Sequence, residues 1–406
     1  MTRDNDRIGR VTELMKAQGL DALVCHRSHS ILMLSGYLPV LGQSIVVLLP
    51  DGDGVLIAPE AESFFAKDGW FTDIRTFNPI TLDYILSPLD VAAPLLAEVC
   101  YEKGIADGVL GIEARDTTTP ASYLESYSLG CMPRDRWTTL LPAADLRDAD
   151  DLLEEAAAIK TRREIEHIRI ASMLAQYGFE AAKHALRVGA REVEVAAAAK
   201  SAVETEGTGR ANVRRVDAWA FCMSGPRSAD AHLPYQYSTN RQLETGDAAV
   251  VHINCHADGY WTDLTRTFFV GDPSPEQEDA YSAVLEAWDR AFRTVGQGMK
   301  AADVDAAARS VLREHDYGDA FVHGTGHGVG FKAIYHGERP VIHPQSEDVL
   351  ENDMVFNIEP AVYLRERWGI RVCDVVSVRG DEAKVLSEMR RDIDWATCPI
   401  DWEVKQ

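Results

Sequence analysis

The sequence predicts an α+β protein with two domains, each of which mixes helices and strands. The chain has 406 residues, which is more than a single hydrophobic core usually serves. Its 46% hydrophobic and 26% charged residues are typical of a globular protein. Apolar residues follow helical spacing in some segments and form short β-type runs in others. We place the boundary just before a long amphipathic helix, which divides the chain into residues 1–151 and 152–406.

Helix-like and strand-like segments alternate in the first half, which predicts a mixed α/β N-terminal domain. Residues 8–18 have the spacing of an amphipathic helix, and residues 22–26 (ALVCH) have the composition of a buried strand. Residues 44–59 predict a β-hairpin, because two apolar runs are separated by the turn-forming pair Asp51-Gly52.

The second half contains three predicted helices among strand-like segments. The first begins near Arg162, after which apolar residues recur at helical spacing. The second begins at Ser274, which can cap the helix with Pro275 at the first helical position and Gln277 at the capping-box position. The third covers residues 304–314.

The charge balance and the cysteine content exclude several kinds of partner and location. Lys and Arg number 41 against 64 Asp and Glu, a net charge of −23, which repels nucleic-acid backbones and anionic membrane surfaces. No apolar run reaches the ~18 residues of a membrane-spanning helix, and the highly charged N-terminus is unlike a signal peptide. The seven cysteines are scattered without a CxxC pair, which favours a reducing compartment. We therefore expect a cytoplasmic protein that binds neither nucleic acid nor membranes.

Acidic and histidine side chains gather at the edges of apolar, strand-like segments in the second half. The stretch HINCHADGYWTD (252–263) predicts a hairpin that turns at an Asp-Gly pair and carries His252 and Asp263 on its two arms. Other such residues are His327 in HGTGHGVG and Glu359 in NIEP. Asp, His and Glu are usual ligands of hard and borderline divalent metals, and a bound cation is one way to satisfy a partly buried carboxylate. Each residue alone also suits a turn, a loop or a surface charge, but together they indicate a metal or acid–base site.

The second half resembles the pita-bread family, which includes Xaa-Pro aminopeptidases, prolidases, methionine aminopeptidases and creatinase. The resemblance rests on GYWTDLTRTFFVG, on HGTGHGVG with the later HGERP, and on NIEP and GIR. It implies a pita-bread domain over residues 152–406, preceded by a creatinase/prolidase-like domain over residues 1–151. It also implies a homodimeric hydrolase that cleaves the C–N bond of small amides, amidines or Xaa-Pro-type dipeptides.

The resemblance further implies five ligands for two metal ions, and this chain departs from that pattern at two positions. Asp263, His327 and Glu359 match it, whereas His252 and Cys373 stand where the pattern has an aspartate and a glutamate. Because two carboxylates are lost, two tightly bound dications are disfavoured. One divalent transition metal, such as zinc, iron or manganese, and operation without metal are the alternatives. A core histidine and a small buried thiol are the structural alternatives for the two replaced positions.

Two histidines outside the ligand set match family positions that move or stabilise protons. They are His232 in AHLP and His336 in HGERP, and imidazole suits this work because its unperturbed pKa lies near neutrality. In the metal-free alternative, Glu359 would activate water and His232 would carry the proton.

Two further residues are expected to bind substrate. Arg371 can grip a carboxylate with two parallel hydrogen bonds. Tyr37, by the resemblance, lies where the N-terminal domain reaches toward the pocket of a neighbouring subunit.

Two other functions compete with hydrolysis on this scaffold. One is a lyase acting on a small zwitterionic organosulfur compound, because fold alone does not determine chemistry. The other is a catalytically inactive pita-bread protein that binds a partner, which the replacements at His252 and Cys373 would allow.

Overall fold

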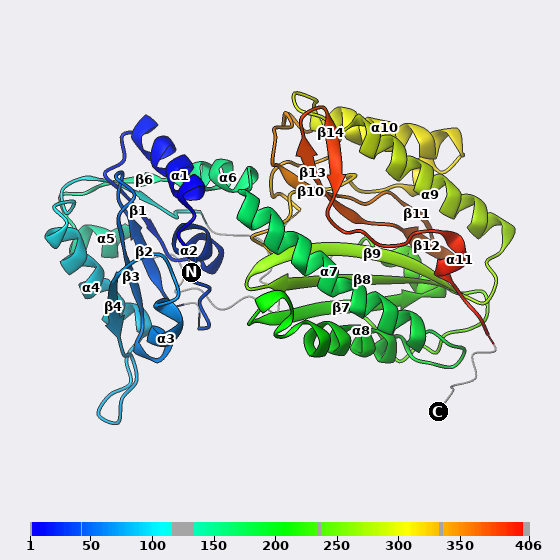
Figure 1. The fold of residues 1–406 in the computed structure, drawn as a ribbon, viewed down its shortest axis with the longest axis horizontal. Coiled ribbons are helices and arrows are strands. Elements are labelled where there is room, and N and C mark those ends of the chain that lie inside the picture. Colours follow the sequence, from blue (N-terminus) through cyan, green and yellow to red (C-terminus); the bar gives the residue numbers. More distant parts are fainter. Residues whose placement is uncertain (1, 42, 116–133, 234–236, 333–335, 401–406) are drawn as a thin grey trace. The chain divides into compact units, whose positions relative to one another are not determined.

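The computed structural model describes residues 2–41, 43–115, 134–233, 237–332 and 336–400 (Figure 1). The chain divides into two compact units, Met1–Ala157 and Ala158–Gln406. The predicted boundary between residues 151 and 152 falls inside helix α6 (Asp150–Ala158), near whose end the two units separate.

The first unit contains a mixed sheet and helices, as predicted for an α/β domain. The strand order in its described part is β4-β3-β2-β1-β5-β6, with the β1–β2 and β2–β3 pairs antiparallel and the other pairs parallel. The predicted strand 22–26 and the predicted hairpin 44–59 are confirmed as β1 and the β2–β3 pair. Apolar side chains of the sheet pack with α4 to form the core of this unit. Its elements are α1 (Asn5–Ala17), β1 (Ala22–Cys25), α2 (Ser28–Ser35), β2 (Ile45–Leu48), β3 (Gly54–Pro59), η1 (Glu60–Glu62), α3 (Ser63–Ala66), β4 (Asp73–Phe77), α4 (Pro88–Glu102), β5 (Val109–Ile112), α5 (Arg134–Leu140), β6 (Asp145–Asp148) and α6.

The second unit is built on three sheets in its described part. They have the strand orders β15-β9-β8-β7, β11-β12 and β10-β13-β14. The predicted hairpin is confirmed as β8–β9, and its tip residues Asp258 and Gly259 have φ values of 51° and 89°, as a tight hairpin turn requires. The strands are β7 (Val216–Ser224), β8 (Ala248–Ala257), β9 (Tyr260–Val270), β10 (Val355–Ile358), β11 (Ala361–Leu364), β12 (Trp368–Arg371), β13 (Asp374–Arg379), β14 (Glu382–Val385) and β15 (Thr397–Cys398).

Helices cover these sheets and close the core. Helix α7 contacts β8 and β9 while α8 contacts β7, and Figure 1 shows the two helices along the same sheet. The predicted start of α7 at Arg162 is confirmed, with Thr161 as the cap, and the predicted capping box of Ser274 and Gln277 begins α9. Helices α9 and α10 pack on each other, and α9 contacts β12 and β14. The helical elements are α7 (Arg162–Ala185), α8 (Glu192–Gly207), η2 (Arg210–Asn212), η3 (Gly225–Asp230), α9 (Pro275–Thr294), α10 (Ala301–Glu314), η4 (Gly318–Ala320) and α11 (Ile393–Ala396).

The state of the cysteines and the presence of membrane-spanning helices, on which the composition gave expectations, can be compared with this fold. The six cysteines in the described ranges are free thiols, and Cys131 lies outside those ranges. Within the same ranges, no helix has both the length and the apolar character needed to cross a membrane.

Candidate metal centre and active site

The β8–β9 hairpin brings His252 and Asp263 to one face of its sheet. In the antiparallel register, Asn254 pairs with Asp263 and His252 pairs with Thr265. Directly paired residues share a face, as do alternate residues of one strand. The hairpin therefore presents these four buried polar side chains together.

His327 lies in a loop that runs beside strand β10. Its backbone N–H donates to Asn357 Oδ1 (2.7 Å), and its carbonyl accepts from Asn357 N (3.0 Å). The flanking residues must be glycine, because a Cβ would lie 1.9 Å from Asn357 O at Gly326 and 2.3 Å from Arg339 O at Gly328. The Gly-His-Gly sequence therefore allows the loop to pack closely enough to present the imidazole beside β10.

Glu359 and Cys373 follow the ends of strands β10 and β12. The backbone N–H of Glu359 donates to Thr325 O (2.7 Å), which holds Glu359 against the loop that carries His327. Cys373 lies between β12 and β13 and forms a β-bridge with Thr265 on β9. The ends of these strands thus bring residues that are distant in the sequence close together in the fold.

Four of the predicted ligands converge around one point. Asp263, Glu359 and Cys373 each offer one ligand atom, and these atoms all lie within 4.8 Å of one another. His327 Nε2 lies 3.6 Å from Asp263 Oδ2 and 4.0 Å from Glu359 Oε1. Its Nδ1–H donates to Gly328 O (2.9 Å), since a carbonyl can only accept. In the neutral ring Nε2, which also lies 3.3 Å from the side-chain amide of Asn357, therefore carries the lone pair that a metal would take. Two carboxylates, one imidazole and one thiol in this arrangement fit a single divalent ion.

The two carboxylates of this cluster have pKa values displaced in opposite directions. Burial raises the pKa of Glu359 to about 7. Burial also acts to raise the pKa of Asp263, but the neighbouring His252 and His327 outweigh it and hold that pKa below its usual range. Among the described residues, no N–H or O–H donates a hydrogen bond to the carboxylate of Glu359. One ionised and one readily protonated carboxyl group suit both cation binding and proton transfer.

Arg371 is buried, and its guanidinium is engaged by groups of the chain itself. It donates to Thr265 Oγ1 (3.1 Å), Ala231 O (3.2 Å), Tyr363 OH (3.4 Å) and His252 Nδ1 (3.2 Å). A substrate carboxylate would have to compete with these acceptors. The predicted role of Arg371 in substrate binding stays a prediction.

Both ring nitrogens of His252 are engaged by groups of the chain itself. Nδ1 lies 2.8 Å from Thr265 Oγ1 and 3.2 Å from the guanidinium of Arg371. Nε2 lies 2.6 Å from Asn254 Nδ2 and 3.8 Å from Asp263 Oδ1. Because a guanidinium and an amide NH₂ group only donate, each ring nitrogen faces a donor, and a metal ion would have to displace one of these donors to bind His252.

Of the two predicted catalytic histidines, His232 contacts Tyr363 and His336 contacts His327. His232 is half-buried, and its ring centroid lies 4.9 Å from that of Tyr363. Its Nδ1–H donates to Ala229 O (3.1 Å), which leaves the lone pair of Nε2 for a proton. His336 is exposed, with its ring centroid 4.9 Å from that of His327.

Tyr37 belongs to the first unit and is 1% exposed. Its hydroxyl donates to the buried carboxylate of Glu62, which also accepts from the backbone N–H of Val40 (2.6 Å) and of Leu41 (2.7 Å). In this chain Tyr37 is thus part of the packing that holds residues 40 and 41. Its predicted contact with substrate stays a prediction.

Tyr363 is a site residue that the sequence analysis missed. Its hydroxyl accepts from Arg371 and lies 3.2 Å from Nε2 of His323, whose Nδ1–H donates to Gly324 O (2.7 Å). Nε2 of His323 therefore accepts, and the hydroxyl of Tyr363 is its donor. The spacing could have revealed this residue. Residues an even number of positions apart in an extended segment share a face, and Tyr363 follows Glu359 at such a distance.

Two family models match the chain. Residues 166–380 match metallopeptidase family M24, and residues 7–159 match the creatinase/prolidase N-terminal domain. A metallopeptidase family implies the use of a divalent metal ion, in agreement with the cluster described above.

Relatives and solved structures resemble the chain over nearly its whole length. An Xaa-Pro dipeptidase of Pyrococcus furiosus is 30% identical over 389 residues, covering 96% of this chain and 99% of the relative. The prolidase structure from Pyrococcus horikoshii OT3 has 25% identity and a TM-score of 0.76, covering 96% of this chain and all of that one. The Pyrococcus furiosus prolidase structure has 28% identity and a TM-score of 0.73, covering 94% and 100%. These similarities favour a hydrolase of C–N bonds and do not favour the lyase or the inactive binding protein. Because the M24 model matches more than half of the residues and the N-terminal model matches most of the remainder, the chain belongs to metallopeptidase family M24 and carries the creatinase/prolidase N-terminal domain.

Proposed function

We propose that the chain is a dipeptidase that cleaves Xaa-Pro-type dipeptides with one divalent ion, held by Asp263, His327, Glu359 and Cys373. The observation that carries this proposal is the convergence of these four side chains, three of which place ligand atoms within 4.8 Å of one another. The substrate class is supported by full-length relatives named Xaa-Pro dipeptidase and prolidase.

The proposal of one ion rather than two rests on charge and on the contacts of His252. Both ring nitrogens of His252 face donors of the chain, Arg371 at Nδ1 and Asn254 at Nε2. The guanidinium of Arg371 already places one positive charge near Asp263 and Glu359. The thiol of Cys373 favours a softer ion, zinc or iron, over manganese.

The chain's own residues provide the proton steps of the proposed reaction. When bound, the ion lowers the pKa of a water molecule and polarises the scissile carbonyl. Glu359, whose carboxylate oxygens receive no hydrogen bond from the described residues, takes the proton of the attacking water. His232 delivers a proton through Nε2 to the leaving nitrogen, because its Nδ1 is held by Ala229 O. His336, exposed beside His327, stabilises the developing oxyanion.

We further propose that the enzyme works as a cytoplasmic homodimer. The free thiols of the six described cysteines support a reducing compartment. The dimer rests on the resemblance to prolidases and creatinase, and light scattering of the purified protein tests it.

The proposed function is tested by metal analysis and by assays on matched substrates. Protein purified without chelator is analysed for metal and then assayed on Xaa-Pro dipeptides, on the same dipeptides with alanine in place of proline, and on creatine. We expect about one ion per chain and preferential hydrolysis of the proline substrates. His232→Ala should lower kcat by about 10²–10⁴-fold, whereas Glu382→Ala, at an exposed position of β14, should not. Absence of hydrolysis, or a His232→Ala variant as active as the unmodified enzyme, would contradict the proposal.

A further inference from the structure

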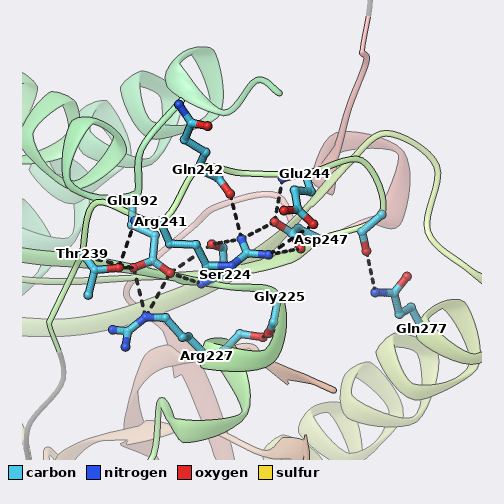
Figure 2. A network of polar contacts seen from close by, with 12 residues as sticks. Glu192, Ser224, Gly225, Arg227, Thr239, Arg241, Gln242, Glu244, Asp247 and Gln277 are labelled. Atoms are coloured by element: carbon cyan, nitrogen blue, oxygen red, sulfur yellow. Dashed lines mark hydrogen bonds and ion pairs between the residues drawn. The ribbon is translucent and has the colours of Figure 1, made fainter. Parts of the chain in front are cut away.

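Glu192, a buried carboxylate outside the metal cluster, contacts both ends of the loop that carries His232. Glu192 is the first residue of α8 and is 0% exposed. One oxygen accepts from Ser224 N (2.8 Å) and Ser224 Oγ (3.0 Å), and the other accepts from Thr239 N (2.9 Å) and Thr239 Oγ1 (2.7 Å). Nε of Arg227 lies 3.3 Å and 3.2 Å from the two oxygens. We call residues 224–233 the first arm of this loop and residues 237–241 its second arm. Figure 2 shows donors from both arms around this single carboxylate.

Further hydrogen bonds connect the two arms. Arg241, on the second arm, donates to Ser224 Oγ on the first (2.8 Å) and to Asp247 Oδ1 (3.0 Å). Arg227, on the first arm, donates to Tyr237 O on the second (2.8 Å) and lies over the ring of that tyrosine. The two arms therefore form one network with Glu192 as the shared acceptor (Figure 2).

The first arm also packs tightly against strand β12, which leads to Arg371. Gly369 N donates to Ser228 Oγ (2.7 Å), and a Cβ at Gly369 would lie 2.1 Å from Ser228 O. Farther along the arm, Ala231 O accepts from Arg371 (3.2 Å), and the next residue is His232. The arm fixed by Glu192 at its start thus ends with His232 beside the candidate site.

We propose that Glu192 is a positioning residue for His232. This inference rests on the proposed role of His232 in catalysis. An ionised carboxylate is suited to the task because it accepts at both oxygens and donates nothing. Replacement by an amide would place an NH₂ group against the donors of one arm, either those of Ser224 or those of Thr239. That arm would then lose its anchor, although the size of the side chain is nearly unchanged.

The test compares Glu192→Gln with Glu194→Gln, a change at an exposed carboxylate in the same first turn of α8. We measure kcat and KM on the best Xaa-Pro dipeptide, metal content, and amide hydrogen exchange of residues 224–241 by mass spectrometry. Glu192→Gln should lower kcat by about 10- to 100-fold, as a displaced catalytic group does, with unchanged metal content and faster exchange in the loop. Glu194→Gln should match the unmodified enzyme in every measurement.

A double-mutant cycle separates positioning from a general structural role. If Glu192 acts through His232, the variant His232→Ala/Glu192→Gln has the same kcat as His232→Ala alone. Multiplication of the two single losses would overturn the inference. If His232→Ala alone keeps full activity, the proposed role of His232 is wrong instead, and the two failures are thereby distinguished.

Thr239→Val provides a second variant if Glu192→Gln does not fold. It removes the hydroxyl that donates to Glu192 at 2.7 Å and accepts from Arg241 N at 3.2 Å, and it keeps the shape of the side chain. We expect a smaller decrease in kcat together with faster exchange in residues 224–241. Unchanged kcat and unchanged exchange would overturn the inference.

Discussion

Two sets of buried carboxylates in the second unit are satisfied in different ways. Glu192 receives hydrogen bonds from backbone N–H groups, hydroxyls and a guanidinium, all between 2.7 and 3.3 Å. Around Asp263 and Glu359, the nearest imidazole nitrogens lie at 3.6 to 4.0 Å. A carboxylate that is saturated with hydrogen-bond donors stabilises the fold. An unsaturated carboxylate, which has few such donors, can still bind a cation or a proton.

The same contrast occurs between the neighbouring residues Cys373 and Asp374. Asp374 accepts from Arg266 (2.6 Å), Ser387 (2.8 Å) and Arg391 (3.2 Å) and is thus fully engaged in packing. The thiol of Cys373 bonds only weakly, at 3.2 Å to Asp263 O and at 3.9 Å to Asp263 Oδ1. Successive side chains of an extended segment point to opposite sides, so Cys373 points into the cluster and Asp374 points into the core.

The largest effect should come from removing an unsaturated carboxylate. Asp263→Ala should lower kcat/KM by about 10³-fold or more, because the ion loses a charged ligand. In chelator, Glu359→Gln should leave the free energy of unfolding the same or raise it, because burial raises the pKa of Glu359 and makes its charge unfavourable in the folded protein. Kinetics and urea denaturation check the two parts. A large loss of stability in metal-free Glu359→Gln would show that Glu359 is as structural as Glu192.

The opposite result is expected for the saturated carboxylate. Glu192→Ala should lower the free energy of unfolding by about 2–4 kcal/mol, because several donors, one of them charged, lose their acceptor. Urea denaturation of Glu192→Ala and of Glu382→Ala as the exposed control measures the difference. Equal stability of the two variants would remove the distinction drawn between the two kinds of carboxylate.

The effect of Cys373 on which metal the cluster binds tests the comparison further. Cys373→Ser should weaken zinc binding by at least the roughly 10–100-fold that even an outer partner contributes. In the cobalt-substituted protein, a thiolate-to-metal charge-transfer band should be present and should disappear in Cys373→Ser. Cys255→Ser is the matched control, because that buried thiol contacts Ala171 O outside the cluster. A band that survives Cys373→Ser would exclude Cys373 as a ligand.

Two buried histidines extend the comparison to the pH dependence of stability. Their expected effect on the free energy of unfolding is the smallest of those predicted. Burial lowers the pKa of His256 to about 4, so its contribution to stability is present above pH 6.5 and is lost as the pH falls toward 4. For His327, burial acts to lower the pKa, but Asp263 and Glu359 outweigh it and raise the pKa to about 9. Its contribution is therefore present below pH 6.5 and is lost as the pH rises toward 9.

The measurement is the free energy of unfolding of the metal-free protein from pH 4 to 9. His256→Gln should remove about 2 kcal/mol of the acid-side decrease, and His315→Gln, an exposed control, should leave it in place. Saturating metal should abolish the alkaline decrease. An acid-side decrease that is identical in His256→Gln would contradict the assignment to this residue.

Local patterns predicted much of the fold. The start of α7 at Arg162, the capping box at Ser274 and the β8–β9 hairpin were all predicted and are confirmed. These features depend on residues within a few positions of one another, so they are visible in the sequence. The candidate ligands Asp263, His327 and Glu359 were found by the resemblance of short motifs, and the structure places them together.

Other properties of the site could not be predicted because they depend on distant partners. Nδ1 of His252 is engaged by Arg371, 119 residues away. Glu192 is satisfied by Ser224 and Thr239, which are 32 and 47 residues away. Nothing in the local sequence of either residue indicates these partners.

The sequence by itself determined where helices and hairpins form, which side chains are available for chemistry, and which family the chain resembles. Only the tertiary structure decided which buried carboxylates are saturated with donors and which are left for a cation. The physical reason is that hydrogen bonding and desolvation depend on neighbours in space, and at this site those neighbours come from strands and loops that are far apart along the chain.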